Sequence, residues 1–232
     1  MNMKTKFFSL FFLSAFIITF NTTYAAGEDW AQFNKYEADN NRIISGPDSL
    51  RPSVVFMGNS ITEMWAKFHP EFFSENNFAG RGISGQTTYQ MLLRFRDDVL
   101  NLKPDLVIIN GGINDIAENN HSYNEDRTFG NIRSMAEMAK AAGIKVVLTS
   151  VLPANRIHWR PTIENVADKV KSLNDRLRDY AEANEFLFID YYTPLADEKR
   201  GLKEEYARDA VHPNVEGYDI MESIVLSSLS AK

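Results

Sequence analysis

The stretch Val54-Val55-Phe56-Met57-Gly58-Asn59-Ser60 decides the fold of this chain. Its first four residues are apolar, as in a strand buried on both faces, and Gly58-Asn59 indicates a turn directly after them. The serine then opens residues 61–68, whose apolar spacing is that of a short helix. A buried strand that passes through a glycine turn into a helix is the building unit of a parallel α/β sheet.

The rest of the chain repeats this alternation of short apolar strands and helices. Further strands are expected at residues 78–79, 106–110, 145–150 and 187–190, and helices at residues 29–43, 86–100, 123–142, 162–184 and 214–229. Short apolar strands between helices predict a parallel sheet covered on both faces, so we expect the α/β class and a three-layer α/β/α sandwich. In such a fold, ligands bind at the carboxyl ends of the strands.

The first residues have the composition of a secretory signal peptide. Residues 1–6 carry two lysines and no acid, residues 7–20 are an apolar run, and a polar stretch leads to the small residue Ala25. The run is shorter than the about 20 residues that span a bilayer, which favours cleavage after Ala25 over a membrane anchor. We expect residues 1–25 to be a signal peptide, residues 26–232 to form a single domain, and the protein to be periplasmic or extracellular.

Composition excludes several classes of partner and site. The chain has a formal net charge of −6, and loss of Lys4 and Lys6 with the leader makes it −8. An acidic surface disfavours nucleic acid and anionic membranes, so we expect no nucleic-acid partner and no stable membrane insertion. The chain has no cysteine, which excludes thiol nucleophiles and cysteine metal sites. Composition gives no indication of the oligomeric state.

A second segment, Asp209-Ala210-Val211-His212-Pro213-Asn214, lies about 150 residues after Ser60 and supplies the other groups of a nucleophilic site. An acid three residues before a histidine can hold one ring nitrogen and leave the other free to take the serine proton. Each segment has a plainer interpretation. Ser60 could be a helix N-cap, and the second segment could only cap the last helix while Asp209 and His212 are solvated.

Two glycine-rich segments between them offer donors for an oxyanion. The backbone N–H groups of Ser60 and Gly85 and the side-chain amide of Asn114 are the candidates, because each follows a predicted strand. The glycines could equally serve as turns, and Asn114-Asp115 as a cap or Asx-turn. The order of all four segments along the chain, each at a strand end, favours a common site.

The loop of residues 153–161 is the candidate substrate-binding segment. It carries Arg156, Trp159 and Arg160, and aromatic and guanidinium groups suit sugars or carboxylates. We predict that Arg156 and Trp159 bind substrate. The alternative is that Trp159 packs on the body and the arginines are solvated.

Together the segments resemble the sequence blocks of the SGNH (GDSL-type) hydrolase family, from residue 53 to the last helix. By this resemblance Ser60, Asp209 and His212 are catalytic, and Ser60, Gly85 and Asn114 form the oxyanion hole. One departure is Gly-Asn-Ser at residues 58–60 in place of the family's Gly-Asp-Ser, as in members that resemble platelet-activating-factor acetylhydrolases and carbohydrate acetylesterases. The resemblance implies a flavodoxin-like sheet and an esterase that needs no metal or other cofactor.

The predicted function is that of a secreted serine esterase that hydrolyses short-chain esters, acetyl esters above all, on a glycan or a small molecule. The alternative is a short-chain lipid or phospholipid acylhydrolase, although the chain has no long apolar loop or lid. A non-catalytic glycan-binding protein of the same fold is disfavoured, because every catalytic and oxyanion position is filled. A metal-dependent hydrolase needs clustered histidines and carboxylates, and Asp115, Glu118 and His121 are close in sequence. It is also disfavoured, because Asp115 belongs to the Asn114 turn and three nearby polar residues on a loop are usually solvated.

Overall fold

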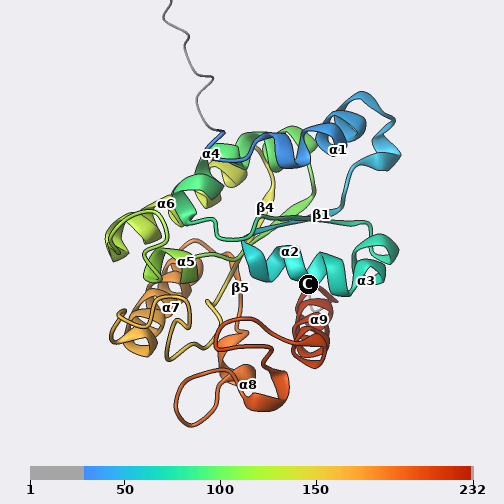
Figure 1. Cartoon of the computed structure of the whole chain (residues 1–232). Coiled ribbons are helices and arrows are strands. Elements are labelled where there is room, and N and C mark those ends of the chain that lie inside the picture. Colours follow the sequence, from blue (N-terminus) through green and yellow to red (C-terminus); the bar gives the residue numbers. More distant parts are fainter. Residues whose placement is uncertain (1–28, 231–232) are drawn as a thin grey trace, which may run out of the picture.

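The computed structural model describes residues 29–230, and the predicted signal peptide lies outside them. A five-stranded sheet, ordered β2-β1-β3-β4-β5, forms its centre (Figure 1). All neighbouring strands are parallel. The strands are β1 (Val54–Gly58), β2 (Phe78–Gly82), β3 (Leu106–Ile109), β4 (Lys145–Thr149) and β5 (Leu187–Ile189). This is the flavodoxin-like order, which confirms the predicted fold class.

Helices cover both faces of this sheet and make the sandwich three layers deep (Figure 1). On one face lie α2 (Ser60–Phe68), α3 (Pro70–Glu75) and α9 (Val215–Ser230). On the other lie α4 (Thr88–Asp98), α6 (Glu125–Ala141) and α7 (Val166–Ala183), and α1 (Asn34–Ser45) packs outside α4. The short helices α5 (Ile113–Ile116) and α8 (Tyr192–Leu195) lie in connections.

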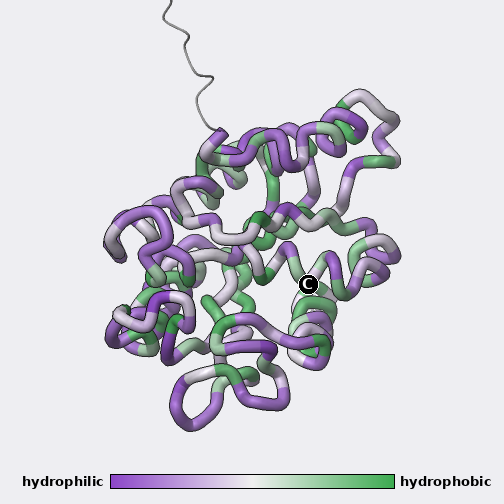
Figure 2. The backbone as a smooth tube through the Cα atoms, in the orientation of Figure 1, coloured by the Kyte–Doolittle hydropathy of each residue, from purple (hydrophilic) through white to green (hydrophobic). Residues whose placement is uncertain are grey.

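The core follows the apolar strands. Every residue of β1 is buried, and Figure 2 shows hydrophobic residues along the central strands. On the α2 face, Phe56 contacts Trp65 and Phe73 edge to face, with ring centroids 5.4 and 5.2 Å apart. No helix within residues 29–230 combines the length and the apolar character that crossing a bilayer requires.

The sheet order fixes where a ligand can bind. After β1 the chain crosses to β2 on one side, and it then returns across β1 to β3 on the other side. Connections therefore leave β1 and β3 in opposite directions, which opens a crevice at their carboxyl ends. Ser60 follows β1 there, and Asn114 follows β3.

The predicted elements are present, and their ends differ by more than two residues in three places. α1 begins at Asn34 rather than residue 29, because Gln32 has a left-handed backbone (φ 54°) and interrupts the helix. α7 begins at Val166 rather than residue 162, after Asn165 with φ 55°. β2 runs on to Gly82, where an added Cβ would overlap the backbone of α2, so close helix packing places a glycine-rich segment in the sheet.

Candidate active site

Ser60 lies at the first position of α2, directly beyond the carboxyl end of β1. The helix is capped by its neighbour instead, because the Asn59 side chain accepts a hydrogen bond from the Ile61 N–H at 3.1 Å. The hydroxyl of Ser60 is therefore not used as an N-cap. Its Oγ lies 2.9 Å from Nε2 of His212, and both residues are buried.

The segment before α9 brings Asp209 to the other side of this imidazole. Its carboxylate oxygens lie 2.9 and 3.0 Å from Nδ1 of His212. Oδ1 also accepts the backbone N–H groups of Val211 and His212, each at 2.9 Å. Burial alone would raise the pKa of Asp209, but these backbone and ring hydrogen bonds outweigh it and lower the pKa below its ordinary value. The group is thus an ionised carboxylate at neutral pH, oriented on the ring.

Gly85 occupies a loop whose other N–H groups are already bonded. The N–H of Ser84 donates to Glu63 Oε2 at 2.7 Å, and that of Gln86 to the Ile83 carbonyl at 3.3 Å. The backbone of Gly85 is left-handed (φ 79°), a conformation that favours glycine. Within the described residues its N–H has no acceptor, so it is available to a ligand.

Three donors meet at the Ser60 pocket. The N–H of Ser60, like that of Gly85, has no acceptor in residues 29–230, and Asn114 Nδ2 donates one hydrogen to the Gln86 carbonyl at 2.9 Å and has a second to offer. The pocket has a volume of about 250 Å³. Its lining residues are Ser60, Met64, Ser84, Gly85, Asn114, Asn119, Trp159 and His212. The structure therefore brings together Ser60, the histidine and all three predicted oxyanion donors.

Arg94, which the sequence analysis did not single out, connects the loops of the site from behind. It is fully buried and donates to the carbonyls of Gly58 (2.8 Å) and Arg81 (2.9 Å) and to Gln86 Oε1 (2.6 Å). Asp98 pairs with it at 2.7 Å and balances its charge. Arg94 thereby fixes the turn before Ser60 relative to the Gly85 loop. The sequence offered one indication of this buried role, namely an arginine on the apolar face of the helix predicted at residues 86–100.

The segment of residues 29–45, here called the N-terminal brace, holds the Gly85 loop from its outer side. Gln86 Nε2 donates to the Ala31 carbonyl at 2.7 Å. The hydroxyl of Tyr36 donates to the Gly82 carbonyl at 2.5 Å, and burial raises the pKa of this tyrosine to about 12. The brace therefore contacts both ends of the loop that carries Gly85.

Glu63 links the brace to the same loop. Oε1 pairs with Lys35 of the brace at 2.9 Å and with Lys67 at 2.8 Å, while Oε2 accepts the Ser84 N–H. Burial alone would raise the pKa of Glu63, but the hydrogen bonds from both lysines and from Ser84 lower it to about 2. Glu63 is therefore ionised at neutral pH, and it accepts the N–H of Ser84, the residue before Gly85. The N–H of Gly85 has no such acceptor within residues 29–230.

Trp159 lines the Ser60 pocket, and its role in substrate binding stays a prediction. Its ring stacks on that of His212, with centroids 6.0 Å apart and planes 28° apart. Its Nε1 donates to Asn119 Oδ1 at 3.0 Å, and Asn119 Nδ2 donates to the Gly85 carbonyl at 3.1 Å. Asn119, which the sequence did not reveal, joins the Trp159 loop to the Gly85 loop. Arg156 is exposed and does not line the pocket, and its role stays a prediction.

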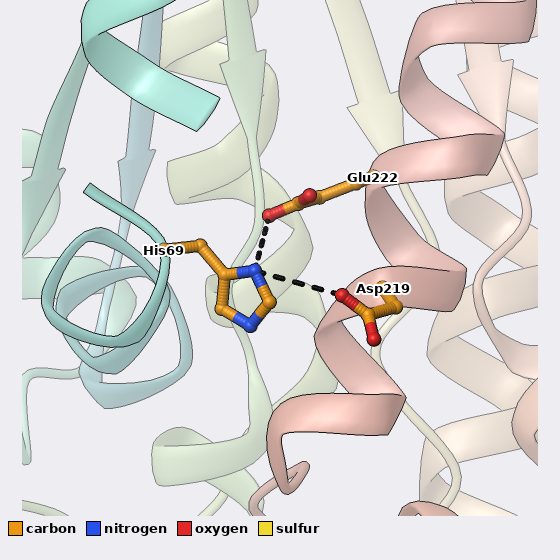
Figure 3. A group of neighbouring side chains, drawn as sticks. All are labelled: His69, Asp219 and Glu222. Carbon is orange, nitrogen blue, oxygen red and sulfur yellow. Dashed lines mark ion pairs between the residues drawn. The ribbon is translucent and has the colours of Figure 1, made fainter. Parts of the chain in front are cut away.

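A histidine–carboxylate cluster lies elsewhere, at the junction of α9 with the α2–α3 connection. Figure 3 shows Nδ1 of His69 facing Glu222 and Asp219, at 3.0 and 3.7 Å. These groups are close enough to hold an ion. Glu222 Oε1 also accepts the Trp65 indole N–H at 2.9 Å, so the cluster joins α9 to α2 by hydrogen bonds. The prediction that catalysis needs no metal or other cofactor stays a prediction.

A parallel α/β sandwich with a serine, a histidine and free N–H donors at its switch point defines the hydrolase class. Residues 56–220 match the model of the GDSL-like Lipase/Acylhydrolase family. The chain belongs to this family and is a carboxylic-ester hydrolase of the GDSL type, as its sequence predicted. The alternative of a non-catalytic binding protein is not supported.

Two solved structures are similar to this chain over most of its length. A GDSL-like lipase from Bacteroides thetaiotaomicron VPI-5482 is 51% identical with a TM-score of 0.83, and the match covers 87% of this chain and 99% of that one. A structure from Bacteroides fragilis NCTC 9343 is 50% identical with a TM-score of 0.84, covering 88% and 98%. An acetylxylan esterase from Geobacillus stearothermophilus, at 22% identity and a TM-score of 0.60 over 76% and 93%, shares the fold.

The matches to two curated proteins cover a smaller share of those proteins than the matches to the solved structures do. The N-acylneuraminate cytidylyltransferase of Escherichia coli O18:K1:H7 is 25% identical over 173 residues, which are 73% of this chain and 38% of that protein. The uncharacterized lipoprotein YqeF of Bacillus subtilis is 37% identical over 75 residues, 31% of each chain. The chain therefore spans well under half the length of these relatives.

Proposed function

We propose that the protein is a secreted serine esterase that removes short acyl groups, acetyl above all, from a glycan. Ser60 Oγ attacks the acyl carbon while His212 Nε2 takes the hydroxyl proton, and Asp209 stabilises the imidazolium. The N–H groups of Ser60 and Gly85 and the Asn114 amide bind the oxyanion that forms. The intermediate collapses to an acyl-enzyme and expels the alcohol, to which His212 gives its proton.

The second half of the reaction uses the same groups. His212 takes a proton from a water molecule, and the resulting nucleophile attacks the acyl carbon held on Ser60. Collapse of the second oxyanion breaks the bond to Oγ, which recovers its proton from the imidazolium, and the carboxylic acid leaves. The single observation that carries the proposal is the Ser60 Oγ to His212 Nε2 distance of 2.9 Å beside two N–H groups that have no acceptor in the described residues.

The size and lining of the pocket support a short acyl group. Its volume of about 250 Å³ is below the ~300 Å³ at which pockets for drug-sized ligands begin. Asn119 and Trp159 are hydrogen-bonded across it, which limits its expansion. The exposed part of the Trp159 ring supports a sugar as the alcohol part of the ester. The rival substrate is a short-chain lipid, favoured by the description of the 51% identical B. thetaiotaomicron protein as a lipase.

Hydrolysis of p-nitrophenyl acetate, butyrate and octanoate tests the acyl preference. We expect kcat/KM for acetate to exceed that for octanoate by about tenfold or more, because the octanoyl chain adds methylenes that a short pocket cannot hold. The rates of Ser60→Ala are subtracted as the background. A preference for octanoate would contradict the acetyl assignment and support the lipid alternative.

We further infer that residues 1–25 direct export and that the mature chain begins at Ala26. The charged, apolar and small-residue regions of that segment support this inference. N-terminal sequencing of the protein recovered from the periplasm and from the medium tests it and distinguishes the two locations. A cell-associated chain that still carries residues 1–25 would exclude cleavage.

A further inference from the structure

Several guanidinium groups near the Ser60 pocket have no carboxylate partner. Within residues 29–230, no carboxylate oxygen lies within 4 Å of Arg156, Arg160 or Arg208. Most other arginines, such as Arg133 and Arg176, are paired with acids, here at 2.7 and 2.9 Å, whereas Arg96 and Arg127 are not in the described part of the chain. The chain as a whole is acidic, with a net charge of −6. The Trp159 loop and the segment before α9 thus carry unpaired positive charge on a protein whose net charge is negative.

Among these three arginines, Arg208 is in contact with a residue of the pocket lining, Met64. Its Nη1 lies 3.5 Å from the sulfur of Met64, one helical turn after Ser60 and part of the pocket lining. Its Cζ lies 5.9 Å from the centroid of the Phe68 ring. The guanidinium thus rests on a thioether and a phenyl ring, and most of its N–H donors remain free for a ligand.

The main chain ties Arg208 to the catalytic segment. Its N–H donates to the His212 carbonyl at 2.9 Å, so its position relative to the imidazole is set by the same turn. The neighbouring Asp209 is engaged with the His212 ring and with two backbone N–H groups. The backbone of Arg208 is therefore held by the catalytic segment, while the nearest acid in the sequence, Asp209, is bonded to other groups.

Trp159, whose ring stacks on that of His212, supplies an apolar surface. A ligand seated between Met64 and Trp159 would have its reacting carbon at Ser60, a ring surface to pack on, and the Arg208 guanidinium beside it. Arg156 and Arg160, here called the rim arginines, are exposed on the Trp159 loop and give it positive charge. A guanidinium prefers a planar anion that accepts two hydrogen bonds, and a carboxylate has this geometry.

We propose that Arg208 is a specificity residue that selects esters whose alcohol part is a sugar bearing a carboxylate. The carboxylate binds the guanidinium while the acyl carbon lies against Ser60 Oγ. The inference rests on the proposed esterase function and names its substrate class. The rim arginines attract such an anionic substrate to the pocket. Salt screens this electrostatic attraction and shortens its range.

A matched pair of substrates tests the proposal. The methyl glycosides of glucuronic acid and of glucose, each carrying one acetyl ester on the same ring hydroxyl, differ only at C6, which is a carboxylate in the first and a hydroxymethyl group in the second. We expect wild-type kcat/KM to be about tenfold higher for the glucuronide, and the ratio to fall when salt rises from about 0.02 to about 0.5 M. Arg208→Gln should bring the ratio close to one, while Arg96→Gln, an exposed arginine in the last turn of α4, should keep it.

The outcomes separate this inference from the function beneath it. Equal rates on the two sugars with wild type, or an Arg208→Gln variant that keeps the wild-type ratio, would overturn the role of Arg208 and leave the acetylesterase intact. Hydrolysis of p-nitrophenyl acetate without hydrolysis of either sugar would overturn both the glycan assignment and this inference. Thermal unfolding of each variant shows whether a lost ratio reflects lost folding.

Discussion

Replacing Ser60 with alanine is expected to lower kcat on p-nitrophenyl acetate by on the order of 10⁴-fold or more. The substitution removes the only hydroxyl that lies against His212 Nε2 in the described residues, so no acyl-enzyme can form. The helix should be unaffected, because Asn59 rather than Ser60 supplies the side-chain cap. Steady-state kinetics and thermal unfolding, measured together, check both parts of this expectation.

Ser84 provides the control for this variant. It also lines the pocket, but its hydroxyl has no contact with the histidine among the described residues. A fluorophosphonate reagent should label wild type and Ser84→Ala and should leave Ser60→Ala unlabelled. Retention of label or of wild-type turnover by Ser60→Ala would show that another residue is the nucleophile.

Replacing Asp209 with asparagine is expected to lower kcat by about 10³- to 10⁴-fold with little change in KM. An amide in this position can donate to Nδ1, which would place the imidazole proton on Nε2 and prevent that nitrogen from taking the Ser60 proton. The amide also lacks the negative charge that stabilises the imidazolium. The loss should appear in kcat, because the pocket lining of Asn119 and Trp159 stays in place.

Asp219 is a matched control, because it is a second aspartate beside a histidine. It lies 3.7 Å from His69 in the α9 cluster, away from the Ser60 pocket lining. Asp219→Asn should keep kcat within about twofold, as is usual for exposed sites. An Asp209→Asn variant with kcat within tenfold of wild type would mean that the carboxylate does not orient the base.

Much of the fold could be predicted because its strands are short apolar runs. β1 and β4 are buried along most of their length, and their residues carry the signal that places them. β2 was predicted too short, since Gly80 and Gly82 have low strand propensity and are required by the close approach of α2. Local preference was overridden there by tertiary packing.

The site residues also divide into those that the sequence could predict and those that it could not. The groups expected to react lie in short motifs, and Ser60, Asp209 and His212 meet as their spacing suggested. The supporting groups do not have such motifs. Arg94 and Asn119 act through carbonyls of segments distant in the chain, and only the folded arrangement reveals which carbonyls those are.

The order of the sheet has a consequence for the time at which the enzyme becomes active during its own synthesis. A ribosome makes Ser60 together with the N-terminal brace, and it makes His212 about 150 residues later. Until that later segment is made and α9 is hydrogen-bonded to α2, the nascent chain carries the Ser60 hydroxyl without its base. A polypeptide that ends before residue 212 lacks the group that would take the Ser60 proton, so it cannot carry out the proposed reaction.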